Sequence, residues 1–295
     1  MGAKRPMAEA NKISQLLRVL PDDERFPVDV EKVALELSRV RYSDDPIVSI
    51  NTFDIDGVEG LLGRHPTDRK WKIGYNHRIQ SPGRIRFTLA HEFGHYILHR
   101  EMKSEFRCSL RDMHEWDQRD IEAEADVFAS YLLMPLDDYR NQVAGLLPSI
   151  EMLRHCGNRY GVSLMAAALK WTEIATKRAV VVAARDGFVL WARSNNAAFR
   201  SRVYLPAKKL TIPVPEESIL NQVSVRSGPV TAKQRANLWF EKEPGDIELV
   251  EHALAIGGDY PYTLGLLLLP DATPLWELPE DDLLIPVDQA LRWRK

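Results

Sequence analysis

Apolar residues recur at helical spacing in two segments near the middle of the chain. In residues 86–99 they return every three or four positions, which predicts a helix with one buried face that begins near Pro82 or Thr88. Residues 120–134 show alanine and leucine at the same spacing, with acidic residues in the first turn and Pro135 directly after them. Acidic side chains stabilise a first helical turn and proline ends a helix, so we expect a second helix here.

Shorter patterns before these helices predict further elements. Residues 8–20 and 29–41 show helical spacing. Two short runs within residues 47–63 and one at residues 71–75 read as strands, with Asp-Gly and proline turn signals between them. We expect these strands to form a small antiparallel sheet beside the first central helix. The exposed edge of such a sheet could hold an extended peptide by strand addition.

The pattern changes in the C-terminal half. Residues 149–176 predict one or two helices, and the turn at residues 159–163 is similar to that of a helix-turn-helix. The following helix offers only Ser163 and Lys170 as polar contacts, whereas base readout needs arginine, asparagine or glutamine on one face. Direct DNA binding is therefore not expected. From residue 178 onward, β-like apolar runs and a hairpin signal predict a separate α+β domain.

The composition of the chain indicates its cellular compartment and excludes some classes of partner. The chain has 295 residues, a formal net charge of −3 and a pI near 6.3, which indicates two modest domains and no electrostatic affinity for nucleic acid or anionic membranes. No apolar run approaches 18 residues, and the N-terminus lacks the apolar segment of a signal peptide. The two cysteines, Cys108 and Cys156, fit a reducing compartment. We expect a cytoplasmic protein without a membrane partner.

The strongest chemical pattern is the HExxH motif formed by His91, Glu92 and His95. Four residues are slightly more than one helical turn, so both imidazoles point from the same face of the helix and can bind one zinc ion. The glutamate next to the first histidine then acts as the general base for a water molecule activated by the metal. The alternative is an amphipathic helix whose histidines only pack against the core.

A catalytic zinc site of this kind needs a third protein ligand and an open fourth position. On the helix expected at residues 120–134, Glu122 and Asp126 are four residues apart and share a face. We expect Glu122 to bind the metal and Asp126 to accept the outward N–H of a ligand histidine. Glu124 points away from that face. The alternative, that these acids form a solvated first turn, stays open.

Four other side chains are weaker candidates. His114 and Tyr75 could polarise a substrate carbonyl, although the sequence gives no distance to the metal. His99 continues the face of the two motif histidines but lies too far along the helix for the same ion, so we expect it to support the site from behind or to lie on the surface. Cys108 lies in an expected polar loop and could occupy the open zinc position as a latch. A packing or surface role is the simpler interpretation of this cysteine.

Two segments resemble a known family. FTLAHEFGHYILH at residues 87–99 and EAEADVFASYLLMP at residues 122–135 are similar to the two motif helices of the ImmA/IrrE metallopeptidases, and the resemblance extends over roughly residues 30–175. It implies Zn²⁺ held by the two motif histidines and Glu122, with Glu92 as catalytic base. Members of this family are bacterial or phage-related regulators, several of which cut a helix-turn-helix repressor and so switch on stress, prophage or mobile-element genes.

These patterns and the resemblance predict an α+β chain in three parts. A zincin-like metallopeptidase domain with a small antiparallel sheet is expected over residues 1–147, a short helical unit similar to a helix-turn-helix over residues 148–177, and a C-terminal α+β domain over residues 178–295. We expect the last domain to sense a signal or bind a partner.

The expected activity is that of a gluzincin-like, zinc-dependent endopeptidase with one Zn²⁺ per chain, or another divalent metal such as Mn²⁺ in its place. Its expected substrate is a regulatory protein such as a helix-turn-helix repressor. The alternative is a metal-dependent regulatory binding protein, an antitoxin or a transcription regulator, that holds its partner without cutting it. Glu92 favours the enzyme, because a purely structural zinc site needs no base.

Overall fold

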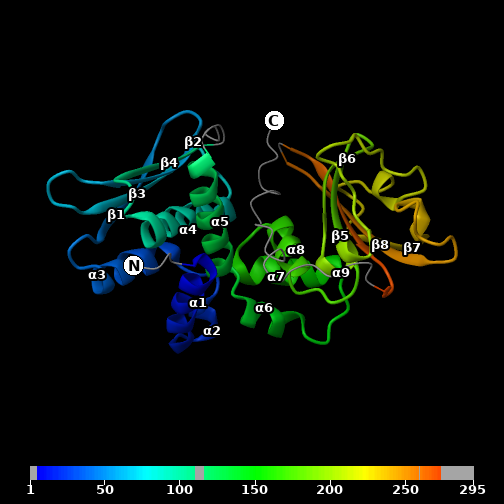
Figure 1. Cartoon of the computed structure of the whole chain (residues 1–295), viewed down its shortest axis with the longest axis horizontal. Helices are drawn as coiled ribbons and strands as arrows, with labels where there is room; N and C mark the ends of the chain where they lie inside the picture. The colour runs from blue at the N-terminus through cyan, green and yellow to red at the C-terminus, as the bar shows by residue number, and fades with distance from the viewer. Residues whose placement is uncertain (1–4, 110–115, 259, 274–295) are drawn as a thin grey trace. The chain divides into compact units, whose positions relative to one another are not determined.

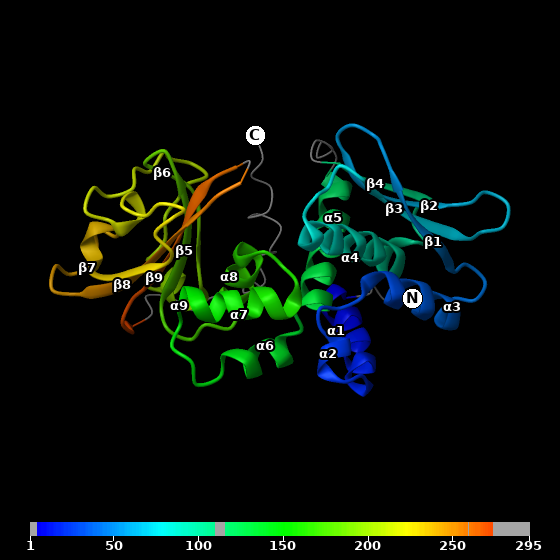
Figure 2. The same cartoon turned by 180° about the vertical axis from the view of Figure 1, so that it is seen from behind.

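The computed structural model describes residues 5–109, 116–258 and 260–273. Helices and two β-sheets alternate along this part of the chain (Figure 1), and Figure 2 shows the same elements from behind. The α+β class expected from the sequence is therefore confirmed.

The chain divides into two compact units. Unit 1 contains the residues up to Gln142 together with Gly157–Ser163, and unit 2 contains Val143–Cys156 together with the described residues from Leu164 onward. Each unit has its own sheet. The division into three domains with a separate helical unit stays a prediction.

Unit 1 opens with the short helices α1 (Pro6–Leu16), η1 (Leu17–Val19), α2 (Asp22–Arg25) and α3 (Val30–Arg41). The side chain of Asp29 accepts a hydrogen bond from the backbone N–H of Lys32 at 3.0 Å. This bond satisfies a donor that the first helical turn leaves free, which explains why the helix predicted at residues 29–41 begins there. The helix predicted at residues 8–20 begins two residues earlier and finishes as a 3-10 turn.

The sheet of unit 1 contains β1 (Ile47–Phe53), β2 (Val58–Arg64), β3 (Trp71–Asn76) and β4 (Glu105–Ser109). Their order is β1-β3-β2-β4, with β1 parallel to β3 and the other two pairs antiparallel. The expectation of a purely antiparallel sheet is therefore wrong for β1. The chain reverses into β2 and again into β3, and β3 inserts between β1 and β2. This path makes β3 run in the same direction as β1.

The strand β4 falls where the sequence suggested a polar loop. Phe106 is buried, whereas the residues on either side of it are exposed, so the strand has one buried and one solvated face. Alternation over five residues is too short to distinguish from a loop by pattern alone. β4 forms one edge of the sheet, and its Phe106 and Cys108 lie opposite Leu62 and Gly60 of β2.

The two helices predicted in the middle of the chain are α4 (Pro82–His99) and α5 (Trp116–Leu133). α4 begins at Pro82, and the hydroxyl of Ser81 accepts a hydrogen bond from the backbone N–H of Arg84 at 3.4 Å. The expectation of a single buried face is wrong, because every residue from Thr88 to Ile97 is buried. The helix lies between the sheet and α5 (Figure 1), so neither side is left to solvent over this stretch.

Small residues let α4 and α5 approach closely. A Cβ atom added to Gly94 would lie 3.0 Å from a ring carbon of Phe128 and 3.2 Å from the Cα atom of Ala125. A larger residue at either small position would push the two helices apart, since helix separation depends on the side chains at the contact. This close approach brings the acidic residues of α5 over the histidines of α4.

Unit 2 is built on an antiparallel sheet in the order β6-β5-β9-β8-β7. Its strands are β5 (Ala179–Arg185), β6 (Phe188–Ser194), β7 (Val230–Arg235), β8 (Glu248–Ile256) and β9 (Tyr262–Leu268). Val180 and Val182 of β5 share a buried cluster with Trp239 and Phe240. The β-like runs seen from residue 178 onward are therefore confirmed as strands.

The remaining helices are α6 (Leu136–Val143), α7 (Ile150–Tyr160), α8 (Leu164–Thr172), α9 (Asn196–Arg200), η2 (Ile219–Asn221) and η3 (Ala236–Leu238). Gly161 joins α7 to α8 at a positive φ of 60°, a conformation that glycine adopts without strain. Lys170 is fully buried, and its ammonium group donates to Glu173 at 3.1 Å. It is therefore not exposed for contact with DNA. Within the described ranges, no helix is long and apolar enough to cross a membrane.

Candidate metal centre

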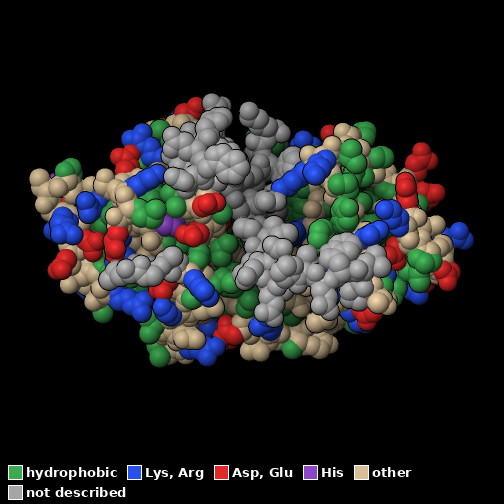
Figure 3. Space-filling view, viewed as in Figure 1, with side chains coloured by type: hydrophobic (Ala, Val, Ile, Leu, Met, Phe, Trp, Pro, Cys, Tyr) green, Lys and Arg blue, Asp and Glu red, His purple; other side chains and the backbone are tan. Residues whose placement is uncertain are grey.

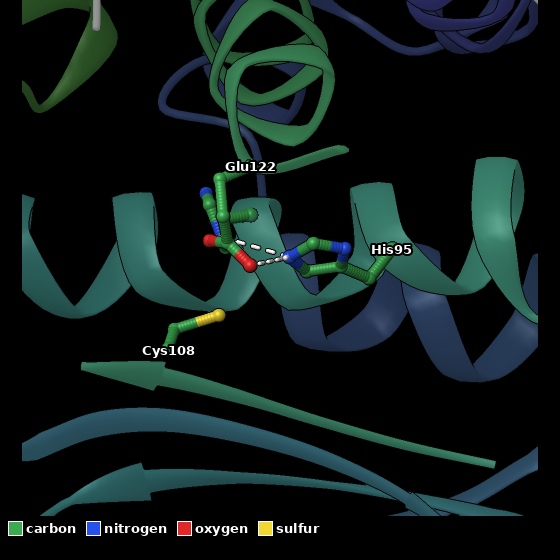
Figure 4. A group of neighbouring side chains, drawn as sticks. His95, Cys108 and Glu122 are labelled. Atoms are coloured by element: carbon green, nitrogen blue, oxygen red, sulfur yellow. Dashed lines mark hydrogen bonds and ion pairs between the residues drawn. The ribbon is translucent and has the colours of Figure 1, made fainter. Parts of the chain in front are cut away.

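Helices α4 and α5 bring three nitrogen and oxygen donors to one point. The Nε2 atoms of His91 and His95 are 3.0 Å apart. The two carboxylate oxygens of Glu122 lie 3.1 Å from Nε2 of His91 and 3.3 Å from Nε2 of His95. Figure 4 shows the carboxylate of Glu122 facing the ring of His95 across the gap between the helices. The structure thus brings together the three residues that the sequence suggested as metal ligands.

The spacing of these donors fits a tetrahedral zinc ion. Ligand atoms about 2.1 Å from such an ion lie about 3.4 Å from one another, close to the separations of 3.0, 3.1 and 3.3 Å among the three donors. The sulfur of Cys108 joins the group, since one donor atom from each of the four side chains lies within 4.8 Å of all the others. The donor set of two imidazoles, a carboxylate and a thiol is also chemically suited to zinc.

Asp126 supports His91 from behind. Its carboxylate lies 2.7 Å from Nδ1 of His91, on the opposite side of the ring from Nε2. A hydrogen bond from Nδ1–H fixes the ring so that the Nε2 lone pair faces the donor cluster. Burial acts to lower the pKa of His91, but the neighbouring Cys108 and Asp126 raise it above its usual range. The structure therefore places Asp126 where the sequence suggested.

His95 is supported by a second and longer chain of contacts. Its Nδ1 atom lies 3.1 Å from Nδ1 of His99, and Nε2 of His99 lies 2.8 Å from the carboxylate of Glu124. The sequence suggested a supporting or surface role for His99 and made Glu124 the weaker candidate on α5, without predicting that the two residues contact each other. Both residues lie behind His95 rather than among the donors.

Glu92 is fully buried beside the donor cluster. Among the described residues, neither of its carboxylate oxygens has a hydrogen-bond partner, although buried polar groups are normally paired. Burial raises the pKa of Glu92 to about 8. A divalent cation close by would favour the ionised form and so act in the opposite direction. An unpaired buried carboxylate therefore fits a site completed by a cation and a water molecule.

Gly60 makes room for Glu92. A Cβ atom at position 60 would overlap the carboxylate of Glu92 and would lie 2.8 Å from Cγ2 of Thr88. Gly60 lies in β2, opposite Cys108 of β4 and opposite Tyr75 of β3. Directly opposed residues point to the same face of a sheet, so these three positions form a row beneath Glu92. The sequence gave no signal for Gly60, because the contact joins segments more than 30 residues apart.

The two auxiliary candidates differ in what the structure says of them. Tyr75 belongs to the row just described and is separated from Cys108 by one strand, so it lies on the sheet face next to α4. His114 falls outside the described residues. Neither role suggested for these side chains is tested by the geometry, and both stay predictions.

The centre is buried but not sealed. The side chain of His95 is fully buried, whereas that of Glu122 keeps 24% of its surface exposed. Figure 3 shows a small area of histidine surface, bordered by acidic and hydrophobic side chains, in the region that Figure 1 labels α4 and α5. The centre is therefore partly open to solvent at Glu122.

Comparison with known families agrees with this geometry. Residues 47–172 match the model of the IrrE N-terminal-like domain, peptidase family M78. This segment is therefore similar to an IrrE N-terminal-like domain. The resemblance found in the two motif segments is thereby confirmed. The matched segment begins with β1 and ends with α8, so it contains α4, β4 and α5 with all the donors described above.

Comparison of the whole chain with solved structures shows a similar fold. A solved structure described as a Mycobacterium tuberculosis transcriptional regulator superposes with a TM-score of 0.55 and 13% sequence identity, covering 88% of this chain and 76% of that one. At this identity the likeness concerns the fold alone, and it extends beyond the matched segment into unit 2. No curated protein matches the chain by sequence.

Proposed function

We propose that this protein is a zinc-dependent endopeptidase. The observation that carries the proposal is Glu92, whose fully buried carboxylate has no hydrogen-bond partner among the described residues and lies beside the donor cluster. Leaving a buried carboxylate unpaired costs free energy. A structural zinc site has no use for such a group, whereas a hydrolytic site needs a base there.

The side chains divide the chemistry between them. His91, His95 and Glu122 would hold the zinc ion, which supplies a lowered water pKa and a polarised substrate carbonyl. Glu92 would accept the proton of the attacking water and then donate it to the leaving amine. Gly60 leaves space for the Glu92 carboxylate at the sheet surface. Asp126 would keep the Nε2 atom of His91 directed at the metal.

The substrate we propose is a regulatory protein with an extended segment at the cleavage site, such as a helix-turn-helix repressor. β4 is an edge strand, and its Cys108 belongs to the donor cluster. A peptide that adds to the free edge of β4 would pass next to the cluster in an extended conformation. The repressor itself rests on the resemblance of the two motif helices to the ImmA/IrrE family.

A second candidate is a regulatory binding protein that uses its metal only for structure. Cys108 favours this reading, because it supplies a fourth protein donor and structural zinc sites are usually closed by four protein ligands. Glu92 argues against it. The two functions differ in whether a peptide bond is broken when Glu92 is present.

The test compares the zinc-loaded full chain with its Glu92→Gln variant. A mixture of unstructured peptides and a candidate repressor is the substrate, and mass spectrometry detects new termini. We expect cleavage by the native protein and a loss of at least about 100-fold in Glu92→Gln at unchanged zinc content, because the amide keeps the shape but cannot take the proton. Glu101→Gln, an exposed glutamate two residues after the end of α4, is the matched control. No cleavage by the native protein would support the binding protein, and equal cleavage by Glu92→Gln would remove Glu92 from the mechanism.

A further inference from the structure

Cys108 approaches the donor cluster from the sheet, whereas the other three donors come from helices. Its sulfur lies within 4.8 Å of the donor atoms of His91, His95 and Glu122. Figure 4 shows the side chain of Cys108 rising from β4 with its sulfur directed toward the carboxylate of Glu122. The strand is held in register by its pairing with β2, in which Cys108 lies opposite Gly60. The position of the sulfur is therefore set by the sheet.

The sulfur also lies next to the general base of the proposed reaction. The thiol of Cys108 is close enough to interact with the side chains of both Glu92 and His91. A base must lie within hydrogen-bond reach of the water that it deprotonates, so the attacking water needs a place between Glu92 and the metal. Cys108 lies in the same neighbourhood, because its thiol interacts with the base and belongs to the donor cluster.

A second observation points to a ligand at this place. The carboxylate of Glu92 is fully buried and makes no geometrically defined hydrogen bond among the described residues, although the Cys108 thiol lies close to it. The carboxylate is packed tightly against Gly60, because a Cβ atom added at position 60 would overlap it. The cluster thus has four convergent donors, with the buried carboxylate of Glu92 beside them. An open catalytic zinc site requires only three protein ligands, so the cluster has one ligand more than such a site needs.

We propose that the sulfur of Cys108 is a fourth protein ligand, which closes the metal centre of the resting protein and admits water and substrate only after it has moved away. The inference rests on the proposed metal site and adds a regulatory state to it. In the closed state His91, His95, Glu122 and Cys108 surround the metal as in a structural zinc site. In the open state the fourth position passes to water beside Glu92.

The fold gives this latch a route to open. Among the described residues, β4 pairs with β2 alone, and this pairing is irregular between Val58 and Gly60. An edge strand with one partner can shift at lower cost than a central strand with two. A peptide that adds to the free edge of β4 would contact the strand that holds the latch, so substrate binding and displacement of the sulfur would be coupled.

The test replaces zinc with Co²⁺ in the full chain and records its absorption spectrum. A thiolate bound to Co²⁺ gives a charge-transfer band in the near ultraviolet, which imidazole and carboxylate ligands do not give. We expect the band in the native protein and in Cys156→Ala, which removes the other cysteine from a buried position in unit 2. We expect Cys108→Ala to bind one Co²⁺ per chain without the band, and to bind zinc more than about tenfold less tightly in competition with a chelator.

Cys108→Ser is the second variant, since it keeps nearly the same shape and guards against misfolding of the alanine variant. Both Cys108 variants should cleave peptides faster than the native protein, because their fourth position is open. A native spectrum without the band, or a Cys108→Ala spectrum equal to the native one, overturns the latch. The Glu92→Gln comparison decides the endopeptidase separately, because a failed protease would still report through cobalt whether Cys108 binds the metal.

Discussion

The Nδ1 atoms of His95 and His99 face each other at 3.1 Å. Two facing nitrogens at this distance share one proton, so one ring donates and the other accepts. Burial lowers the pKa of His95 to about 4 and also lowers the pKa of His99, so both rings are neutral. His99 donates its Nε2–H to Glu124, which leaves its Nδ1 as acceptor. His95 must then donate from Nδ1, and its Nε2 lone pair faces the donor cluster.

The first prediction concerns this chain of contacts. His99→Ala should lower zinc affinity about tenfold or more, because His95 loses the acceptor that fixes its tautomer and ring orientation. The measurement is competition with a chromogenic chelator, combined with circular dichroism to establish folding. His65→Ala is the matched control, since His65 is an exposed histidine in unit 1 outside the cluster. Native zinc affinity in folded His99→Ala would mean that His95 needs no support from His99.

The acids of α5 should differ in their effect on the metal. Glu122→Ala removes a direct donor and should lower zinc occupancy most. Asp126→Ala removes the acceptor behind His91, for which a loss of about 10- to 100-fold in affinity is expected. Glu124→Ala should have the smallest effect, because the carboxylate is 45% exposed and acts only through His99. Equal zinc retention by the three variants in a chelator titration would show that α5 does not provide the third ligand.

Gly60 offers a test of the space around Glu92. Gly60→Ala should displace the Glu92 carboxylate, because the added Cβ would overlap it, and should reduce peptide cleavage by about tenfold or more while zinc stays bound. Overpacking should also destabilise the fold by about 1–3 kcal/mol. Gly63→Ala in the same strand is the control, since nothing lies within 4 Å of its added Cβ. Equal activity of the two variants would mean that Glu92 tolerates a shift or plays no part in the chemistry.

Patterns within single helices could be predicted from the sequence. The spacing of His91 and His95 places both rings on one face of α4, and the spacing of Glu122 and Asp126 does the same on α5. Each pair depends only on helical geometry, which is why it could be predicted. The structure then brings the four side chains together as suggested. The family could be recognised for the same reason, because its motifs lie on these two helices.

Contacts between distant segments could not be predicted in this way. The strand β4 is short and half polar, so nothing in its pattern distinguished it from a loop, and its register against Gly60 depends on the complete sheet. The sequence could therefore suggest Cys108 only as one of several weak candidates for the metal site. The burial of α4 on both sides was missed as well, because a helical period shows an apolar face but not a second covering helix.

The last prediction concerns stability and pH in unit 2. Glu251 of β8 is fully buried, and its carboxylate accepts hydrogen bonds from the Ser218 hydroxyl at 2.5 Å, the backbone N–H of Ile219 at 3.1 Å and the indole N–H of Trp239 at 3.1 Å. Burial raises the pKa of Glu251 above its usual value of 4.5, although the three hydrogen bonds act in the opposite direction. The folded state therefore binds this proton more tightly than the unfolded chain.

A group whose pKa is raised on folding contributes stability below its unfolded pKa and loses that contribution as pH rises through the folded pKa. The free energy of unfolding of the native protein should therefore fall between pH 4.5 and neutral pH by more than that of Glu251→Gln. The side-chain amide of this variant has only one oxygen and cannot accept all three hydrogen bonds. Losing the bond from the backbone N–H of Ile219 should cost about 1–3 kcal/mol at every pH. The slopes against pH must be compared, then, and not the absolute values.

Urea unfolding followed by circular dichroism at several pH values gives these slopes. Glu248→Gln is the matched control, because Glu248 lies in the same strand with 61% of its side chain exposed, and it should reproduce the native slope. If Glu251→Gln also follows the native slope, the carboxyl group has the same proton affinity in the folded and unfolded chain. The hydrogen bonds from Ser218, Ile219 and Trp239 would then balance the cost of burying its charge.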